Sequence, residues 1–176
     1  SRVYANTWRP GDDDPRAIAE RAARIVASGF PALKFDPFFP ADLHMDAAAR
    51  RKALDIVAAV RQAIGEDTDL LIEGHGRFDV HTAIMIANLL EPFRPYWFEE
   101  PVGPESISAL ADVRRRSRVP IAAGERVYDL FHAQDLLRAE AVDVLQPDGH
   151  HAVRSDRDQS EELQAVRRTT AASNAR

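Results

Sequence analysis

The sequence has no cysteine, no apolar stretch near the ~18 residues of a membrane-spanning helix, and no signal-peptide pattern. Without cysteine, the chain forms no disulfide and offers no thiolate to a metal ion. We therefore expect neither export nor a membrane span. The composition agrees with a cytoplasmic protein.

The sequence also lacks the concentrated positive charge that nucleic-acid binding requires. Its formal net charge is −5, and its basic residues are scattered. One short cluster, Arg114-Arg115-Arg116, falls late in an expected helix, where positive charge suits the helix dipole. We expect no nucleic-acid partner.

Apolar runs of two lengths alternate along the chain. With 176 residues, 45% of them hydrophobic, it suits one domain with a substantial core. Strands are expected at 2–6, 32–36, 70–73, 96–99, 121–124 and 142–146. Helices are expected at 17–28, 46–64, 80–90 and 133–138, with a further helix between the last two that ends at about residue 116. This order predicts a parallel α/β fold over residues 1–148. Residues 149–176 show no apolar periodicity and are expected to form an irregular or weakly helical tail.

Three glutamates each close a short apolar run. Glu73, Glu99 and Glu125 follow one another at steps of 26 residues, the length of one strand, one helix and two short loops. Parallel strands would therefore bring the three carboxylates to the same C-terminal edge, where such folds build their sites. Converging carboxylates repel each other unless a cation lies between them, and hard oxygen ligands suit Mg²⁺. The sequence predicts a Mg²⁺ site.

Further polar residues share the predicted edge. Because side chains alternate across a strand, Lys34, Asp36, His75 and Asp148 are expected to surround the three glutamates. The same alternation places Trp97 and Gln146 inside the sheet, and Ala123 on the side of Glu125. A lysine, a histidine and further acids around a metal ion suit acid–base chemistry on an anionic substrate.

These residues occur in motifs that resemble the enolase superfamily, in particular the mandelate racemase/muconate lactonizing subgroup and its sugar-acid dehydratases of the galactonate type. The motifs, in family order, are Val3-Tyr4-Ala5-Asn6, Leu33-Lys34-Phe35-Asp36-Pro37, Glu73-Gly74-His75-Gly76-Arg77, Phe98-Glu99-Glu100-Pro101, Ala123-Gly124-Glu125-Arg126 and Gln146-Pro147-Asp148. The resemblance implies a TIM-like (β/α) barrel with Glu73, Glu99 and Glu125 as Mg²⁺ ligands. It also implies a homo-oligomer in full-length members.

The resemblance implies α-proton abstraction from a sugar-acid carboxylate, followed by β-elimination of water. Lys34 would bind the substrate carboxylate and help to stabilise the enediolate, Asp36 would contribute to substrate binding, and His75 would give a proton to the departing hydroxyl. A racemase or epimerase of the same subgroup is the alternative. It would want a second lysine where this chain has Asp36.

The sequence departs from the family after Asp148. The family pairs this acid with a histidine on the next strand as the general base, and no such histidine follows at the right distance. The last two strands and the N-terminal capping domain are also expected to be absent. Our hypothesis is a truncated reading of a larger gene, with residues 149–176 outside the original frame. We expect no measurable turnover from the chain alone, so an inactive metal-binding barrel fragment is a further alternative.

Overall fold

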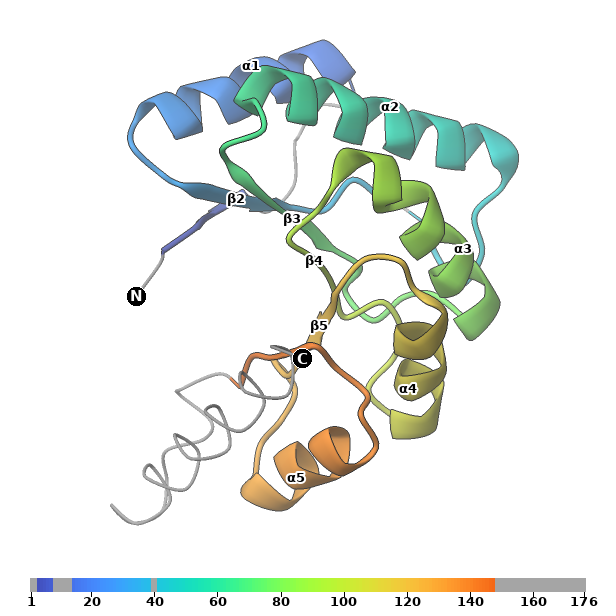
Figure 1. Ribbon diagram of the computed structural model, residues 1–176. Helices are drawn as coiled ribbons and strands as arrows, with labels where there is room; N and C mark the ends of the chain where they lie inside the picture. The colour runs from blue at the N-terminus through green and yellow to red at the C-terminus, as the bar shows by residue number, and fades with distance from the viewer. Residues whose placement is uncertain (1–2, 8–13, 39–40, 148–176) are drawn as a thin grey trace.

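The computed structural model describes residues 3–7, 14–38 and 41–147 (Figure 1). The strands are β1 (Ala5–Thr7), β2 (Ala32–Phe35), β3 (Asp69–Glu73), β4 (Trp97–Glu99), β5 (Ile121–Ala123) and β6 (Val144–Leu145). The helices are α1 (Pro15–Ala27), α2 (Ala47–Ile64), α3 (Val80–Leu90), the 3₁₀ turn η1 (Glu91–Phe93), α4 (Ile107–Arg116) and α5 (Leu130–Arg138).

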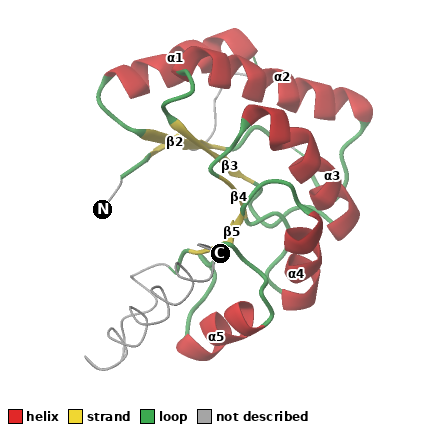
Figure 2. Ribbon diagram, viewed as in Figure 1, coloured by secondary structure: helices red, strands yellow, loops and turns green. Residues whose placement is uncertain are grey.

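The six strands found in the described part of the chain form one parallel sheet. Each strand pairs with its neighbour in sequence, in the order β1-β2-β3-β4-β5-β6. A doubly wound sheet would reverse direction at some point, whereas this order always advances the same way, as in a barrel. The helices accordingly lie along one side of the curved sheet (Figure 2). The predicted partial (β/α) barrel is confirmed.

Aspartate side chains begin most of the helices. Asp14 accepts a hydrogen bond from the Arg16 N–H, with Pro15 at the first helical position, and Asp46 caps α2. The fifth helix begins at Leu130 instead of the expected 133, because Asp129 accepts the N–H of His132 at 2.7 Å. The cap adds nearly a full turn that the apolar spacing did not predict.

The core is divided between the two faces of the sheet. Ile72, Phe98 and Ile121 point outward and are fully buried against the helices. On the inner face, Leu71 and Trp97 belong to a separate small cluster with Ala32 and Ala122. Because side chains alternate along a strand, Glu73 and Glu99, two residues after Leu71 and Trp97, also lie on the inner face, at the ends of their strands.

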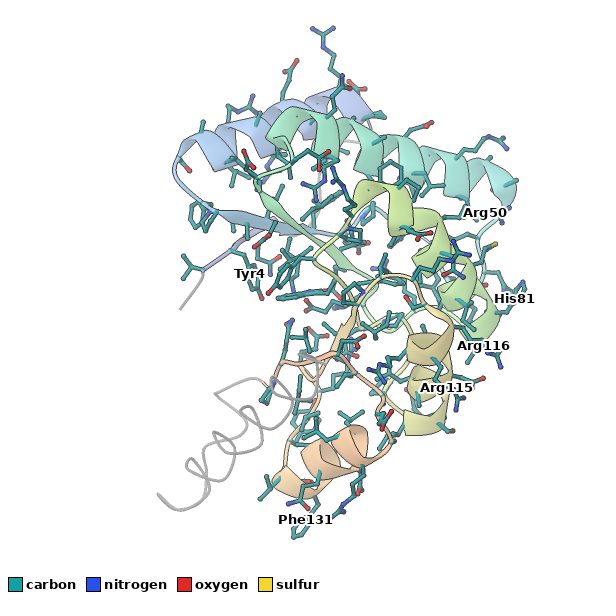
Figure 3. All side chains as sticks on the ribbon, viewed as in Figure 1. Tyr4, Arg50, His81, Arg115, Arg116 and Phe131 are labelled. Carbon is teal, nitrogen blue, oxygen red and sulfur yellow. The ribbon has the colours of Figure 1, made fainter. Side chains whose placement is uncertain are left out.

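The expected surface features lie on the outer helices. Arg115 and Arg116 extend from the last turn of α4 and pair with Asp112, as predicted for an exposed helix end (Figure 3). In the described residues, no helix combines the length and apolar character needed to cross a bilayer. Asp148 and the expected tail at 149–176 lie outside the described residues.

Candidate metal centre

Two of the three predicted ligands lie side by side on adjacent strands. Glu73 ends β3, Glu99 ends β4, and the two are direct partners in the parallel register. Leu71 and Trp97, two residues earlier on each strand, are partners as well and belong to the inner cluster. Both carboxylates therefore point to the inner face, and both residues are almost fully buried.

The third glutamate reaches the site by a different route. The β5 partner of Glu99 is Ala122, so Glu125 lies beyond the end of its strand instead of in register. Our expectation that Ala123 shares the side of Glu125 is wrong, since Ala123 packs in the outer core. The alternation breaks at Gly124, whose φ of 137° turns the chain; a Cβ there would lie 2.9 Å from the backbone of Gln146.

The three carboxylates nevertheless converge. One oxygen from each of Glu73, Glu99 and Glu125 lies within 4.8 Å of the other two. Three carboxylate oxygens form a hard donor set, the kind that Mg²⁺ prefers in proteins. The arrangement thus fits a divalent cation, and the assignment of these residues as ligands stays a prediction.

Lys34 supplies the positive charge nearest to the carboxylates. Its Nζ lies 3.0 Å from Glu73 Oε2 and also forms an ion pair with Glu99. Burial alone would lower the pKa of Lys34, but the two glutamates outweigh it and raise the pKa above the ordinary value. The centre of the Tyr4 ring lies 5.5 Å from Lys34 Nζ. Tyr4 lies on the inner side of the sheet (Figure 3). The lysine is therefore held charged within reach of the predicted metal position.

One lysine does not balance two buried carboxylates. Burial, and next the charge of Glu99, raise the pKa of Glu73 to about 7, although Lys34 and the His75 N–H act to lower it. The site therefore carries a deficit of positive charge near neutral pH. A divalent cation bound to the three carboxylates would remove that deficit, so the charge balance of the site favours a metal centre.

The remaining oxygen of Glu99 is fixed by two side chains on the inner face. Trp97 Nε1–H donates to Oε2 at 2.8 Å, and Gln146 Nε2 donates to the same oxygen at 3.4 Å. Strand alternation had placed both residues inside without assigning them this role. They orient the Glu99 carboxylate and leave Oε1 facing Lys34.

His75 lies beside the carboxylates at the start of the loop that follows β3. Its backbone adopts a left-handed φ of 57°, and its N–H donates to Glu73 Oε1 at 2.8 Å. The ring Nδ1 lies 3.8 Å from Glu125 Oε1 and 3.9 Å from Glu73 Oε1. About a third of the side chain is exposed, so the imidazole stands between the acids and solvent.

Asp36 forms contacts of a different kind. Its carboxylate pairs with both terminal nitrogens of the Arg77 guanidinium and accepts the Phe38 N–H at 2.9 Å. The side chain thus joins the loop after β2 to the loop after β3. Of the four polar residues expected around the glutamates, Lys34 and His75 contact them, Asp36 is bound to Arg77, and Asp148 lies outside the described residues.

Sequence reasoning missed Arg126, which pairs with the third glutamate, and Glu100, a buried acid that the same arginine contacts. Arg126 lies 3.1 Å from Glu125 Oε1 and 3.4 Å from the buried Glu100 carboxylate. Burial raises the pKa of Glu100, against the lowering effects of the Gly124 N–H and of Arg126. Both residues lie inside the quoted motifs, but the sequence alone does not show that Glu100 is buried or that Arg126 pairs with two acids.

The large surface hollow of the described residues is at the other end of the strands. It encloses about 930 Å³ and is lined by residues before β4 and β5 such as Tyr96 and Pro120, together with several arginines. Among these, Arg94 pairs with Glu66 and Arg118 with Glu91. None of the site carboxylates lines this hollow. The candidate site is therefore identified by its charged groups and not by the size of a cavity.

Strands in sequential parallel order, with three carboxylates and a lysine at their C-terminal ends, define a barrel-type α/β domain with a carboxylate cluster that fits a metal ion. The chain belongs to the enolase C-terminal domain-like family, whose family model matches residues 17–153. The family resemblance stated from the sequence motifs is thereby confirmed.

Named relatives point to one type of enzyme. The chain is 46% identical over 147 residues to a D-gluconate dehydratase of Thermoproteus tenax, covering 84% of this chain and 30% of the relative. It is 37% identical to a D-gluconate/D-galactonate dehydratase of Picrophilus torridus, covering 84% and 38%. A crystal structure of a mandelate racemase/muconate lactonizing enzyme-like protein from Roseovarius sp. TM1035 matches with a TM-score of 0.78 at 35% identity, covering 86% of this chain and 41% of that one. The chain thus spans well under half the length of these proteins.

Proposed function

We propose that this domain carries the metal-binding and proton-donating part of a Mg²⁺-dependent sugar-acid dehydratase. The observation that carries the proposal is the convergence of Glu73, Glu99 and Glu125 within 4.8 Å, with a buried lysine on two of them and a histidine beside them. The dehydratases among its relatives are named for gluconate, galactonate and xylonate, which supports an aldonic acid as substrate.

The first part of the reaction is transfer of the proton next to the substrate carboxylate to a general base, which leaves an enediolate with two negative oxygens. The family resemblance gives the role of this base to Asp148 paired with a histidine on the following strand. When bound, Mg²⁺ supplies electrostatic stabilisation of this charge. Lys34 adds to it, because its ammonium is buried and held fully charged by Glu73 and Glu99. A fixed cation in a site shielded from water costs little reorganisation as the charge develops.

The second part is loss of the hydroxyl group on the neighbouring carbon. His75 donates a proton to that oxygen, the carbon–oxygen bond breaks, and the enediolate electrons form the new double bond, so that water leaves and an enol remains. The enol becomes a 2-keto-3-deoxy acid by tautomerisation, in which the carbon that lost the hydroxyl takes up a proton and the enol oxygen releases one. His75 suits this role because its ring is part-exposed and lies within 4 Å of the ligand carboxylates.

The contacts of Asp36 bear on the alternative of a racemase or epimerase. Such an enzyme would need a second base two residues after Lys34, and that position holds a carboxylate bound at both oxygens by Arg77 and Phe38. Asp36 therefore supports the dehydratase over the racemase. Its own contribution to substrate binding is indirect in this arrangement, through the position of Arg77.

A panel of aldonic and aldaric acids, assayed for 2-keto-3-deoxy products, tests the proposal. In an enzyme with this site, His75→Asn is expected to abolish dehydration while Mg²⁺ still binds, and Glu99→Gln is expected to lose both. Dehydration at the original rate by His75→Asn would refute the role given to the histidine. If the chain by itself binds Mg²⁺ but turns over no acid, the reading of an inactive metal-binding fragment is favoured.

A further inference from the structure

Glu100 is a buried acid that the proposed chemistry does not use. It follows the ligand Glu99 directly, yet it is only 3% exposed and its backbone has a left-handed φ of 44°, an unfavourable conformation for a residue other than glycine. Its carboxylate is not among the oxygens that converge on the metal position. A buried charge in such a backbone needs partners that compensate for the loss of water.

The partners of Glu100 belong to the loops on both sides of its own. Its Oε1 accepts the N–H of Gly124 at 2.8 Å, at the turn that directs Glu125 toward the metal position. Its backbone carbonyl accepts the N–H of Gly76 at 2.6 Å, in the loop that carries His75. Glu100 thus joins the two loops that follow β3 and β5.

Arg126 extends this connection to the third ligand. One terminal nitrogen of its guanidinium lies 3.4 Å from Glu100 Oε2, and the other lies 3.1 Å from Glu125 Oε1. The second nitrogen also donates to the backbone carbonyl of His75 at 3.5 Å. The arginine is therefore shared between a buried acid that faces away from the metal position and a part-exposed acid that faces it.

From this arrangement we infer that Glu100 and Arg126 are positioning residues that set the third ligand, Glu125, for metal binding; the inference rests on the proposed metal site. Glu100 holds the Gly124 turn and keeps one side of the guanidinium occupied. Without that negative charge, Arg126 is free to pair with Glu125 through both terminal nitrogens and to compete with the cation. Glu100 thus favours metal binding although it never touches the metal.

Asp143, which binds the N-terminal end of β5, offers a matched control for Glu100, which binds the turn after the C-terminal end of that strand. Asp143 Oδ2 accepts the N–H of Ile121 at 2.9 Å, and its Oδ1 accepts from two nitrogens of Arg114 at 3.0 Å. Like Glu100, it is an acid that binds one backbone N–H of the β5 segment and one arginine. Asp143, however, contacts the start of β5, at the end of the sheet away from the three converging carboxylates.

The test measures Mn²⁺ affinity by calorimetry and unfolding in urea on the same proteins. Because residues around metal ligands typically contribute 10- to 100-fold in affinity, Glu100→Gln is expected to weaken Mn²⁺ binding by about tenfold or more. Asp143→Asn is expected to lower stability without changing Mn²⁺ affinity. Adding Arg126→Met to Glu100→Gln removes the competing guanidinium and is expected to restore part of the affinity.

Arg126→Lys provides a second readout if Glu100→Gln does not fold, because a single ammonium cannot span both carboxylates and weaker Mn²⁺ binding is again expected. Unchanged affinity in Glu100→Gln, or an equal loss in Asp143→Asn, would overturn the positioning role while leaving the proposed function intact. If the unmodified chain, in which the site is complete in its three carboxylates, bound no Mn²⁺, both the proposed function and this inference would fall.

Discussion

Replacing Lys34 by methionine tests the charge balance of the site directly. Methionine keeps an unbranched side chain of similar length but removes the charge that faces Glu73 and Glu99. The side chains of Lys34 and of both glutamates are less than a tenth exposed. Breaking a buried ion pair by removing one partner typically costs about 3–5 kcal/mol. The contact of Nζ with the Tyr4 ring adds about 0.5–1 kcal/mol. We therefore expect a loss of roughly 4 kcal/mol at about pH 8 without metal.

The pH dependence of that loss separates charge from packing. Without Lys34, the pKa of Glu73 rises further above its value of about 7 in the unmodified chain. At about pH 8 the folded variant therefore holds a proton on Glu73 that the unmodified chain has mostly released, and the unmodified chain takes this proton up only as the pH falls toward 7. The difference in unfolding free energy is expected to narrow by about 1 kcal/mol over that unit.

Urea unfolding followed by circular dichroism, in EDTA and in excess Mg²⁺, provides the assay. Mg²⁺ is expected to stabilise Lys34→Met more than the unmodified chain, because the cation replaces the missing charge. Lys52→Met, at an exposed position on α2, is the control and is expected to change little. A loss in Lys34→Met that is the same at both pH values and insensitive to Mg²⁺ would refute the reasoning and indicate lost packing instead.

Three smaller predictions follow from other contacts. The pKa of Glu73 is raised from 4.5 to about 7 in the folded, metal-free chain, so protonated Glu73 contributes stability that is fully present below pH 4.5 and is lost as the pH rises through 7. The loss is at most about 3 kcal/mol. Glu73→Gln should flatten the dependence of the unfolding free energy on pH, measured by urea unfolding. Gly124→Ala should destabilise the chain by about 1–3 kcal/mol, since its Cβ would lie 2.9 Å from the Gln146 backbone; a midpoint equal to that of the unmodified chain would contradict this. Asp129→Ala should cost about 1 kcal/mol by removing the α5 cap, with Asp129→Asn as the tolerated control in thermal unfolding.

Much of the fold could be predicted because local and tertiary signals agree. The third helix was expected at residues 80–90 and is observed there, since the Asp79 cap and Glu91-Pro92 mark both of its ends. The start of α5 was expected three residues late, because its first turn includes the exposed Phe131 and depends on the Asp129 cap instead of on apolar burial. Periodicity detects buried faces, so a turn held by a cap is missed.

The site was predictable where it follows the register of the sheet and not beyond it. Spacing and alternation placed Glu73 and Glu99 correctly, because both residues end strands in the same ladder. Glu125 occurs at the same spacing for a different reason, a turn at Gly124 that alternation does not describe. The roles of Glu100 and Arg126 depend on a left-handed backbone and on contacts between loops. Neither has a signature in a single sequence.

The sequential strand order has a consequence for how the site is assembled. Each of the three carboxylates comes from a different β–α unit, and the strand of each unit pairs with the strand of the unit before it. During folding, the cation site is therefore complete only when the last of the three units, β5 with α5, has docked. A divalent ion that binds all three carboxylates would link these units to one another, and it would slow the local unfolding of the β5–α5 unit. Protection of the β5 amides from hydrogen exchange would then rise with ion occupancy.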